Sequence, residues 1–175
     1  METKKNKKSP VSVICSVLGT ALLILLIVSC IPLTVPRMFG YQIYTVISGS
    51  MEPAIPTGSL VFIKDMEPQN VQEEDVIAYY GGRDSNAIIT HRVMENRVVM
   101  GEFITKGDAN QTEDMNPVDY DNFLGRVEKS IPKAGIFAQM LTSMEGKIAA
   151  ACVIGLSLIL HVMASVFDRR KDGMK

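Results

Sequence analysis

Two long apolar runs constrain this chain more than any other feature. Residues 11–35 are almost unbroken apolar sequence, and residues 148–167 form a second run of similar kind. A helix of about twenty residues crosses a bilayer core of roughly 30 Å. The second run could instead be a buried core helix, but residues 36–147 could hardly cover such a helix on all sides. The sequence therefore predicts two transmembrane helices.

The charged residues predict how the chain crosses the membrane. Four lysines lie within residues 1–10, and four basic residues lie within residues 168–175. The positive-inside rule places both of these tails in the cytoplasm, so residues 36–147 form an extracytoplasmic domain. That domain carries 16 of the 19 acidic and 10 of the 18 basic residues, a net charge of −6. An acidic domain without a basic stripe argues against nucleic acid as a partner.

The cysteines exclude several kinds of chemistry from this domain. Cys15, Cys30 and Cys152 all fall within the apolar runs, and one of the two histidines, His161, does so too. The domain between the runs therefore has no disulfide, no cysteine nucleophile and no thiolate metal cluster. We expect no metal and no cofactor.

The first apolar run has an alternative interpretation. The residues that end at Cys30 resemble the processing box of a bacterial lipoprotein, which would make Cys30 the first residue of the mature protein. However, residues 31–35 remain apolar, where a lipoprotein normally begins a polar tether. An uncleaved anchor fits the sequence better.

The middle of the chain has the pattern of a small β domain. Alternating and β-branched residues predict antiparallel strands over residues 41–47, 60–63, 76–80, 87–94, 98–106 and 120–129, the last with a bulge at Gly125. Tight turns are expected at residues 81–84 and 95–97. The predicted fold is a mainly β domain with two transmembrane α-helices.

A membrane-proximal segment, residues 131–147, connects the β domain to the second run. Its apolar residues recur at helical spacing between residues 136 and 144. This pattern fits an amphipathic helix on the membrane, the beginning of the second span, or a helix packed on the β domain.

Ser48-Gly49-Ser50 follows the first predicted strand and places two hydroxyl groups at a strand end. Gly49 lets the backbone turn tightly there, which suits an exposed nucleophile, although most such tripeptides are simple turns. A serine nucleophile needs a base. His91 is the one histidine between the apolar runs, and an imidazole is well suited to general-base catalysis near neutral pH.

Three motifs together resemble the type I signal peptidases. Ser-Gly-Ser-Met-Glu-Pro at residues 48–53 resembles the catalytic-serine segment of this family. Thr90-His91-Arg92 resembles the histidine-bearing strand of the endoplasmic-reticulum-type branch, which also occurs in archaea and some Gram-positive bacteria. Ordinary bacterial members carry a lysine base there. The segment Thr105–Asn110, which contains Lys106-Gly107-Asp108, and the acid six residues after Asp108, Asp114, resemble the family's Lys-Gly-Asp box and its following acid.

The resemblance implies a membrane-bound serine endopeptidase that removes signal peptides from exported preproteins, cleaving after small residues at the −1 and −3 positions. Ser50 would be the nucleophile and His91 the general base. Ser48 and the backbone N–H of Ser50 would form the oxyanion hole. Asp114 ranks ahead of Asp108 as the acid that accepts the second imidazole N–H.

The resemblance also implies partners and a location. We expect signal-peptide-bearing preproteins, the lipid bilayer and secretion-machinery or accessory subunits as partners, in a bacterial cell membrane. Lys106 is the alternative base, but it would have to lose its proton in an apolar site. The alternative function is that of a non-catalytic, membrane-anchored scaffold or binding protein with the same fold.

Overall fold

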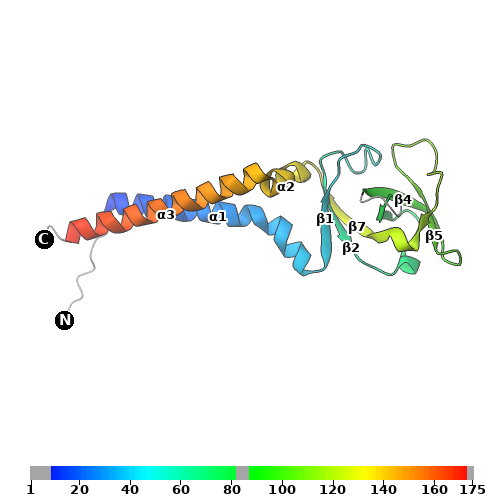
Figure 1. The fold of residues 1–175 in the computed structure, drawn as a ribbon, viewed down its shortest axis with the longest axis horizontal. Helices are drawn as coiled ribbons and strands as arrows, with labels where there is room; N and C mark the ends of the chain where they lie inside the picture. Colours follow the sequence, from blue (N-terminus) through cyan, green and yellow to red (C-terminus); the bar gives the residue numbers. More distant parts are fainter. Residues whose placement is uncertain (1–8, 82–86, 173–175) are drawn as a thin grey trace. The chain divides into compact units, whose positions relative to one another are not determined.

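The computed structural model describes residues 9–81 and 87–172. The lysines of the amino-terminal tail, the end of the carboxy-terminal tail and most of the turn expected at residues 81–84 lie outside the described residues. The chain forms two compact units: one joins the segments before Leu33 and after Met140, and the other is Leu33–Met140. Figure 1 shows the helices and strands that compose these units.

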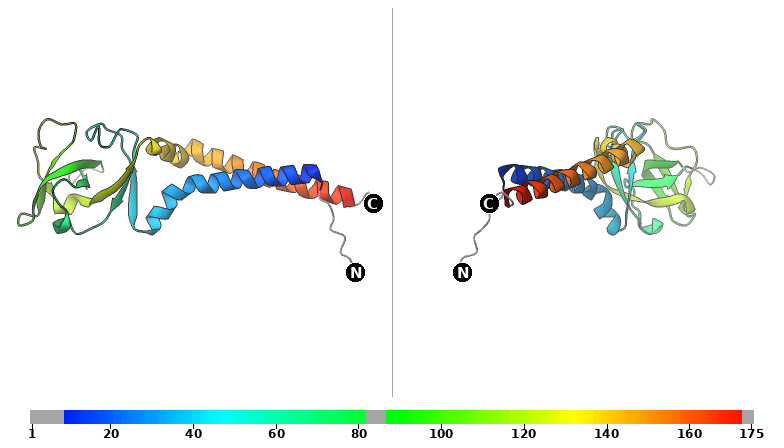
Figure 2. Two further views of the ribbon diagram at one scale, coloured as in Figure 1. Left: turned by 180° about the vertical axis from the view of Figure 1, so that it is seen from behind. Right: turned by 60° about the vertical axis from the view of Figure 1, so that its left-hand side comes forward.

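Two long helices make up the first unit. Helix α1 spans Pro10–Met38 and helix α3 spans Met144–Asp172, and both views in Figure 2 show them side by side over much of their length. Pro10 occupies the first helical position, where a missing N–H costs nothing. Both helices are long and apolar enough to cross a membrane, and only 11% of each apolar window is buried. Because a core helix would be covered, we interpret both as candidate transmembrane helices.

Small and polar side chains mediate the contact between α1 and α3. Ser157 is fully buried and donates its hydroxyl proton to the carbonyl of Gly19 at 2.9 Å. A Cβ atom at Gly19 would lie 2.6 Å from the ring of His161, so the glycine permits this close approach. Nδ1 of His161 lies 2.8 Å from the Ser157 carbonyl, and its Nε2 lies 3.3 Å from the Thr20 hydroxyl. His161 therefore contributes to helix packing.

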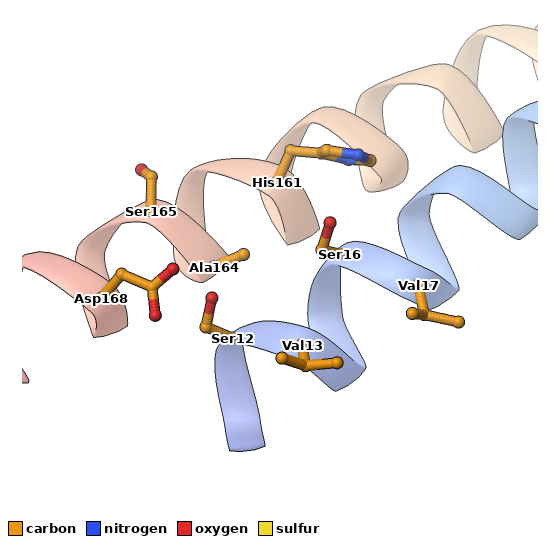
Figure 3. Close-up of a pocket in the computed structure, with 8 residues that line it drawn as sticks. All are labelled: Ser12, Val13, Ser16, Val17, His161, Ala164, Ser165 and Asp168. Atoms are coloured by element: carbon orange, nitrogen blue, oxygen red, sulfur yellow. The ribbon is translucent and has the colours of Figure 1, made fainter. Parts of the chain in front are cut away.

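A polar pocket of about 390 Å³ lies on the same helix pair (Figure 3). Asp168 lines it and accepts a hydrogen bond from the backbone N–H of Ser9 at 3.0 Å. Because residues of both helices line it, the pocket marks the face through which α1 and α3 pair. Its lining consists of Ser12, Val13, Ser16, Val17, His161, Ala164, Ser165 and Asp168.

The second unit contains one curled antiparallel sheet, with the strand order β1-β2-β7-β3-β4-β5-β6. This confirms the predicted mainly β, antiparallel fold. The strands are β1 (Tyr41–Thr45), β2 (Leu60–Lys64), β3 (Val76–Tyr80), β4 (Ile88–Arg97), β5 (Glu102–Lys106), β6 (Val118–Asp119) and β7 (Phe123–Ile131). Single-turn helices η1 (Pro68–Asn70) and η2 (Tyr120–Asn122) lie in the connections.

Two apolar clusters of the sheet position the candidate site. One cluster joins β2 and β3 to Met51 and Ile55, which follow the Ser-Gly-Ser segment. The other is built around Phe103 on β5, whose side chain is fully buried. The core therefore holds both the serine segment and the strands that precede the Lys-Gly-Asp box.

Helix α2 (Ala134–Thr142) fits the interpretation in which the membrane-proximal segment packs on the β domain. Ala138 is buried and packs in a cluster with Leu60 and Phe62 of β2. Ile136 and Phe137, in contrast, are 58% and 68% exposed. One side of the helix therefore covers the sheet, while the other presents apolar side chains outward.

The structure corrects several strand boundaries. Strand β1 ends at Thr45 instead of residue 47, and β7 spans Phe123–Ile131 instead of residues 120–129, because residues 120–122 form η2. The turn expected at residues 95–97 is wrong, because β4 continues to Arg97 and the turn lies between Arg97 and Glu102. The short strand β6 was not predicted; it pairs with β5 through Val118. The irregularity expected at Gly125 is present: its φ is +145°, and a Cβ there would run into the carbonyl of Lys64.

Candidate active site

The segment after β1 carries Ser48 and Ser50. The backbone N–H of Val46 donates to the carbonyl of Ser59 at 2.9 Å, which fixes the chain as it leaves the strand. Met51 then inserts its fully buried side chain into the core. Oγ of Ser50 lies 3.5 Å from Oγ of Ser48. The core thus holds two neighbouring hydroxyl groups in place.

Glu52 ties the other end of this segment to the turn that follows it. Its carboxylate accepts hydrogen bonds from the backbone N–H and the hydroxyl of Thr57, at 3.2 and 2.9 Å. These bonds lower the pKa of Glu52 below its usual value, because they stabilise the ionised form. The sequence motif contains Glu52, but nothing in the motif indicates this role.

His91 lies on β4, paired with Ile77 of β3, and only 8% of its surface is exposed. Its Nδ1 lies 2.6 Å from Oδ2 of Asp114. Since a carboxylate accepts, Nδ1 carries the proton of this bond, and Nε2 is left with its lone pair in the neutral ring. The structure therefore brings Asp114, and not Asp108, to the imidazole.

Gly107 brings the serine segment and His91 to the same place. The carbonyl of Ser50 accepts a hydrogen bond from the backbone N–H of Ala109 at 2.9 Å. A Cβ atom at Gly107 would lie 2.7 Å from that carbonyl oxygen and 3.0 Å from Nε2 of His91. Nε2 of His91 and the Ser50 backbone therefore flank one position, which only a residue without a side chain can occupy at this spacing.

Asp108, the second candidate for the acid that contacts His91, pairs with Arg92 instead. It accepts two hydrogen bonds from the guanidinium group of Arg92, at 2.8 and 2.6 Å. Arg92 also donates to the carbonyl of Glu74 at 2.7 Å. The hydrogen bonds with Asp108 raise the pKa of Arg92. This bidentate pair fastens the loop after β5 to β4.

Two hydroxyl groups to which the sequence motifs assign no role surround Asp114. The hydroxyl of Thr105, which is fully buried, donates to Oδ2 of Asp114 at 2.6 Å. The hydroxyl of Tyr79 lies 3.3 Å from the same oxygen and 3.3 Å from Nδ1 of His91. Burial raises the pKa of Tyr79 to about 12, so its hydroxyl stays protonated near neutral pH.

Lys106 lies beside this network but on the other face of the strand. Successive side chains of a strand point to opposite faces, and Thr105 points toward Asp114. Lys106 consequently points away from it. Within residues 9–81 and 87–169, no three His, Cys, Asp or Glu side chains are grouped to hold a metal ion.

A groove of about 430 Å³ begins at Ser48. Strand β1 lies at one end of the strand order, so one of its sides lacks a partner among the described strands. The start of β4, up to His91, pairs with β3 but not with β5. Both strand edges border the groove, whose lining is Tyr44, Thr45, Val46, Ile47, Ser48, Val61, Ala87, Ile88, Ile89 and Thr90.

Comparison with known proteins gives related sequences of one kind, although no protein-family model matches the chain. Signal peptidase I W of Bacillus subtilis is 40% identical over 91 residues, which cover 50% of this chain and 46% of that protein. The signal peptidase complex catalytic subunit SEC11 of Komagataella phaffii is 33% identical over 129 residues, covering 65% of this chain and 73% of the relative. The human subunit SEC11C is 28% identical over 130 residues, 67% of each chain. This chain thus spans about half the length of the Bacillus relative and most of the yeast one.

Proposed function

The chain belongs to the type I signal peptidases, in their endoplasmic-reticulum-type branch, and from this membership we propose that it removes signal peptides from exported preproteins as a serine endopeptidase. The observation that carries the proposal is the pairing of His91 Nδ1 with Asp114 at 2.6 Å, while Nε2 faces the glycine that also contacts the Ser50 carbonyl. This arrangement leaves a basic nitrogen beside the serine segment. A hydrolase needs that arrangement, whereas a scaffold has no use for it.

In the proposed reaction, Oγ of Ser50 attacks the scissile carbonyl carbon and its proton passes to Nε2 of His91. Asp114 accepts a hydrogen bond from Nδ1–H throughout, and the proton stays on the ring, so the carboxylate holds the ring orientation and stabilises the imidazolium. The Nε2 proton then goes to the leaving amine, which breaks the peptide bond and leaves an ester on Ser50. A water molecule, deprotonated by the same nitrogen, hydrolyses the ester and restores the serine.

The negative oxygen of each tetrahedral intermediate requires donors. We assign this role to the backbone N–H of Ser50 and the hydroxyl of Ser48, which lies 3.5 Å from the nucleophilic oxygen. One such donor contributes about 3–4 kcal/mol to transition-state stabilisation. Asp108 contributes indirectly, because its bond with Arg92 holds the loop that carries Gly107.

The groove beside Ser48 supports an extended substrate. A peptide that lies between β1 and the start of β4 could use the unpaired backbone groups of both strand edges. The groove has a volume of about 430 Å³, and several residues of the substrate would share it, which favours substrates with small side chains. This fits the proposed cleavage after small residues at the −1 and −3 positions.

The two apolar helices support a membrane location for this reaction. We propose that α1 and α3 both span the bilayer, that both tails are cytoplasmic, and that residues 36–147 face the extracytoplasmic side of a bacterial cell membrane. Substrates whose apolar segments remain in the same bilayer would then reach the site at high effective concentration. Because the names of the SEC11 relatives place them in a complex, accessory subunits are further candidate partners.

Cleavage by the purified full-length protein tests the proposal. In detergent or lipid, the wild type should cut a preprotein with an Ala-x-Ala site at the bond after the second alanine, whereas folded Ser50→Ala and His91→Ala variants should not. An inert wild type on several preproteins, or an active Ser50→Ala variant, would instead favour the scaffold function. Intact-mass analysis of the cellular protein tests the anchor: a mature chain beginning at Cys30 would replace α1 with a lipid.

A further inference from the structure

We propose that Thr105 is a positioning residue for the hydrolysis, and that Tyr79 assists it, by fixing the carboxylate of Asp114 against His91. This inference rests on the proposed function, because it concerns the same reaction. Tyr79 lies outside the sequence motifs of the site, and Thr105, the first residue of the Lys-Gly-Asp segment, has no role assigned to it by the motif. Thr105 acts through Asp114, and Tyr79 acts through both Asp114 and His91. Neither contacts the serine segment among the described hydrogen bonds.

Thr105 holds Asp114 at two points. Its hydroxyl donates to Oδ2 at 2.6 Å, and its backbone carbonyl accepts the N–H of Asp114 at 2.9 Å. The threonine is fully buried on β5, so water cannot replace its hydroxyl as a donor. One residue of a paired strand therefore fixes both the backbone and the side chain of the loop aspartate.

The donors converge on a single carboxylate oxygen. Oδ2 of Asp114 receives Nδ1–H of His91 and the Thr105 hydroxyl, both at 2.6 Å, and the Tyr79 hydroxyl at the longer distance of 3.3 Å. A carboxylate with an unconstrained torsion can turn its other oxygen toward the imidazole. Two additional donors on Oδ2 remove that freedom, because any rotation breaks their hydrogen bonds.

Tyr79 fixes the imidazole as well as the acid. Its ring meets that of His91 edge to face, with the centroids 6.2 Å apart and the planes at 70°. Its hydroxyl is equidistant from Nδ1 of His91 and Oδ2 of Asp114, at 3.3 Å. These bonds are longer than that of Thr105, so the contribution of Tyr79 is the smaller one.

Substituting Thr105 tests the proposal in the full-length enzyme. Thr105→Val keeps the β-branched shape and loses the donor, so it should lower kcat by about 10- to 100-fold while KM changes by less than about 2-fold. Thr105→Ser keeps the donor and should restore most of kcat. Tyr79→Phe should lower kcat only a few-fold. Thr112→Val, the same chemical change on an exposed residue of the loop that carries Asp114, is the control and should remain fully active.

A double-mutant cycle separates positioning from a structural role. In an Asp114→Asn background, Thr105→Val should cause little further loss of kcat, because its effect passes through the carboxylate. An equal loss in both backgrounds, or an inactive Thr105→Ser, would overturn the proposal. So would a folded Thr105→Val with wild-type kcat. If the wild type itself cleaves no preprotein, the proposed function fails first, and the two failures remain distinguishable.

Discussion

Gly107→Ala should inactivate the enzyme with little effect on its fold. The added Cβ would lie 2.7 Å from the carbonyl oxygen of Ser50 and 3.0 Å from Nε2 of His91. Carbon contacts favour about 3.5–4.0 Å, so the serine and the histidine must move apart by roughly 1 Å in total. The Ser50 carbonyl is held by the N–H of Ala109, which limits relaxation. A displacement of about 1 Å in an active site costs about 100-fold in rate.

The assay is kcat/KM for cleavage of a preprotein with an Ala-x-Ala site, with the thermal unfolding midpoint measured in parallel. We expect the loss in kcat, because the groove beside Ser48 does not include Gly107. Gly155→Ala is the control: it lies in α3, and a Cβ there meets nothing within 4 Å. A folded Gly107→Ala enzyme with kcat within about 3-fold of the wild type would refute the idea that this glycine allows the nucleophile segment and the base to lie close together.

Three further predictions address the acids and the core. Asp114→Asn should lower kcat on the order of 10³-fold, because the amide cannot accept the imidazole N–H in the same way. Asp108→Asn weakens only the bond that holds the loop to Arg92, so it should lower kcat by about 10-fold. Folding lowers the pKa of Glu52, so the ionised carboxylate stabilises the folded protein above pH about 4.5, and this contribution is lost as the pH falls. The thermal unfolding midpoints of Glu52→Gln and wild type should therefore differ at pH 7 and converge at lower pH. Phe103→Ala should destabilise the domain by about 3–5 kcal/mol in denaturant unfolding, since this side chain is fully buried; a loss under about 1 kcal/mol would contradict its place in the core.

Much of the fold was predictable because its signals are local. The two apolar runs extend over more residues than any strand of the sheet, and the structure extends them into helices of 29 residues each. The strands alternate in the expected way, and β3 has the predicted bounds. The turn between β4 and β5 was misplaced because Glu95, Asn96 and Arg97 favour a turn by composition. In the sheet, Asn96 donates two hydrogen bonds to the carbonyls of Pro68 and Val71, and these tertiary bonds extend the strand.

The choice between Asp108 and Asp114 depends on contacts that no local pattern contains. In the register of β4 and β5, Arg92 pairs with Lys106, so Asp108, just past the strand end, meets the guanidinium of Arg92. Asp114 reaches His91 only because the loop returns to β5 and bonds there through its own backbone. The family resemblance favoured the residue that the structure places at His91, but the reason for it lies in the strand register.

Thr105 could have been found from the alternation of β5. Phe103 and Thr105 are buried and lie on the same face of the strand, while the residues between and after them are partly exposed. A threonine hydroxyl at a core-facing position must have a partner, because burying it unpaired would cost stability. The sequence therefore predicts that the Thr105 hydroxyl has a hydrogen-bond partner. Only the tertiary structure identifies that partner as the carboxylate of Asp114.

The edge of β1 that has no partner among the described strands connects the architecture with the proposed reaction. An exposed strand edge invites pairing with other chains, and proteins commonly protect such edges. Here the edge leads directly to Ser48 and borders the groove, opposite the part of β4 that lacks β5 as a partner. Covering this edge would remove the substrate site in the proposed function. In the proposed function, a preprotein segment would pair with this edge only until the bond is cut, and the pairing would bring the scissile carbonyl to Ser50. An edge that is a hazard in other sheets would then position the substrate in this one.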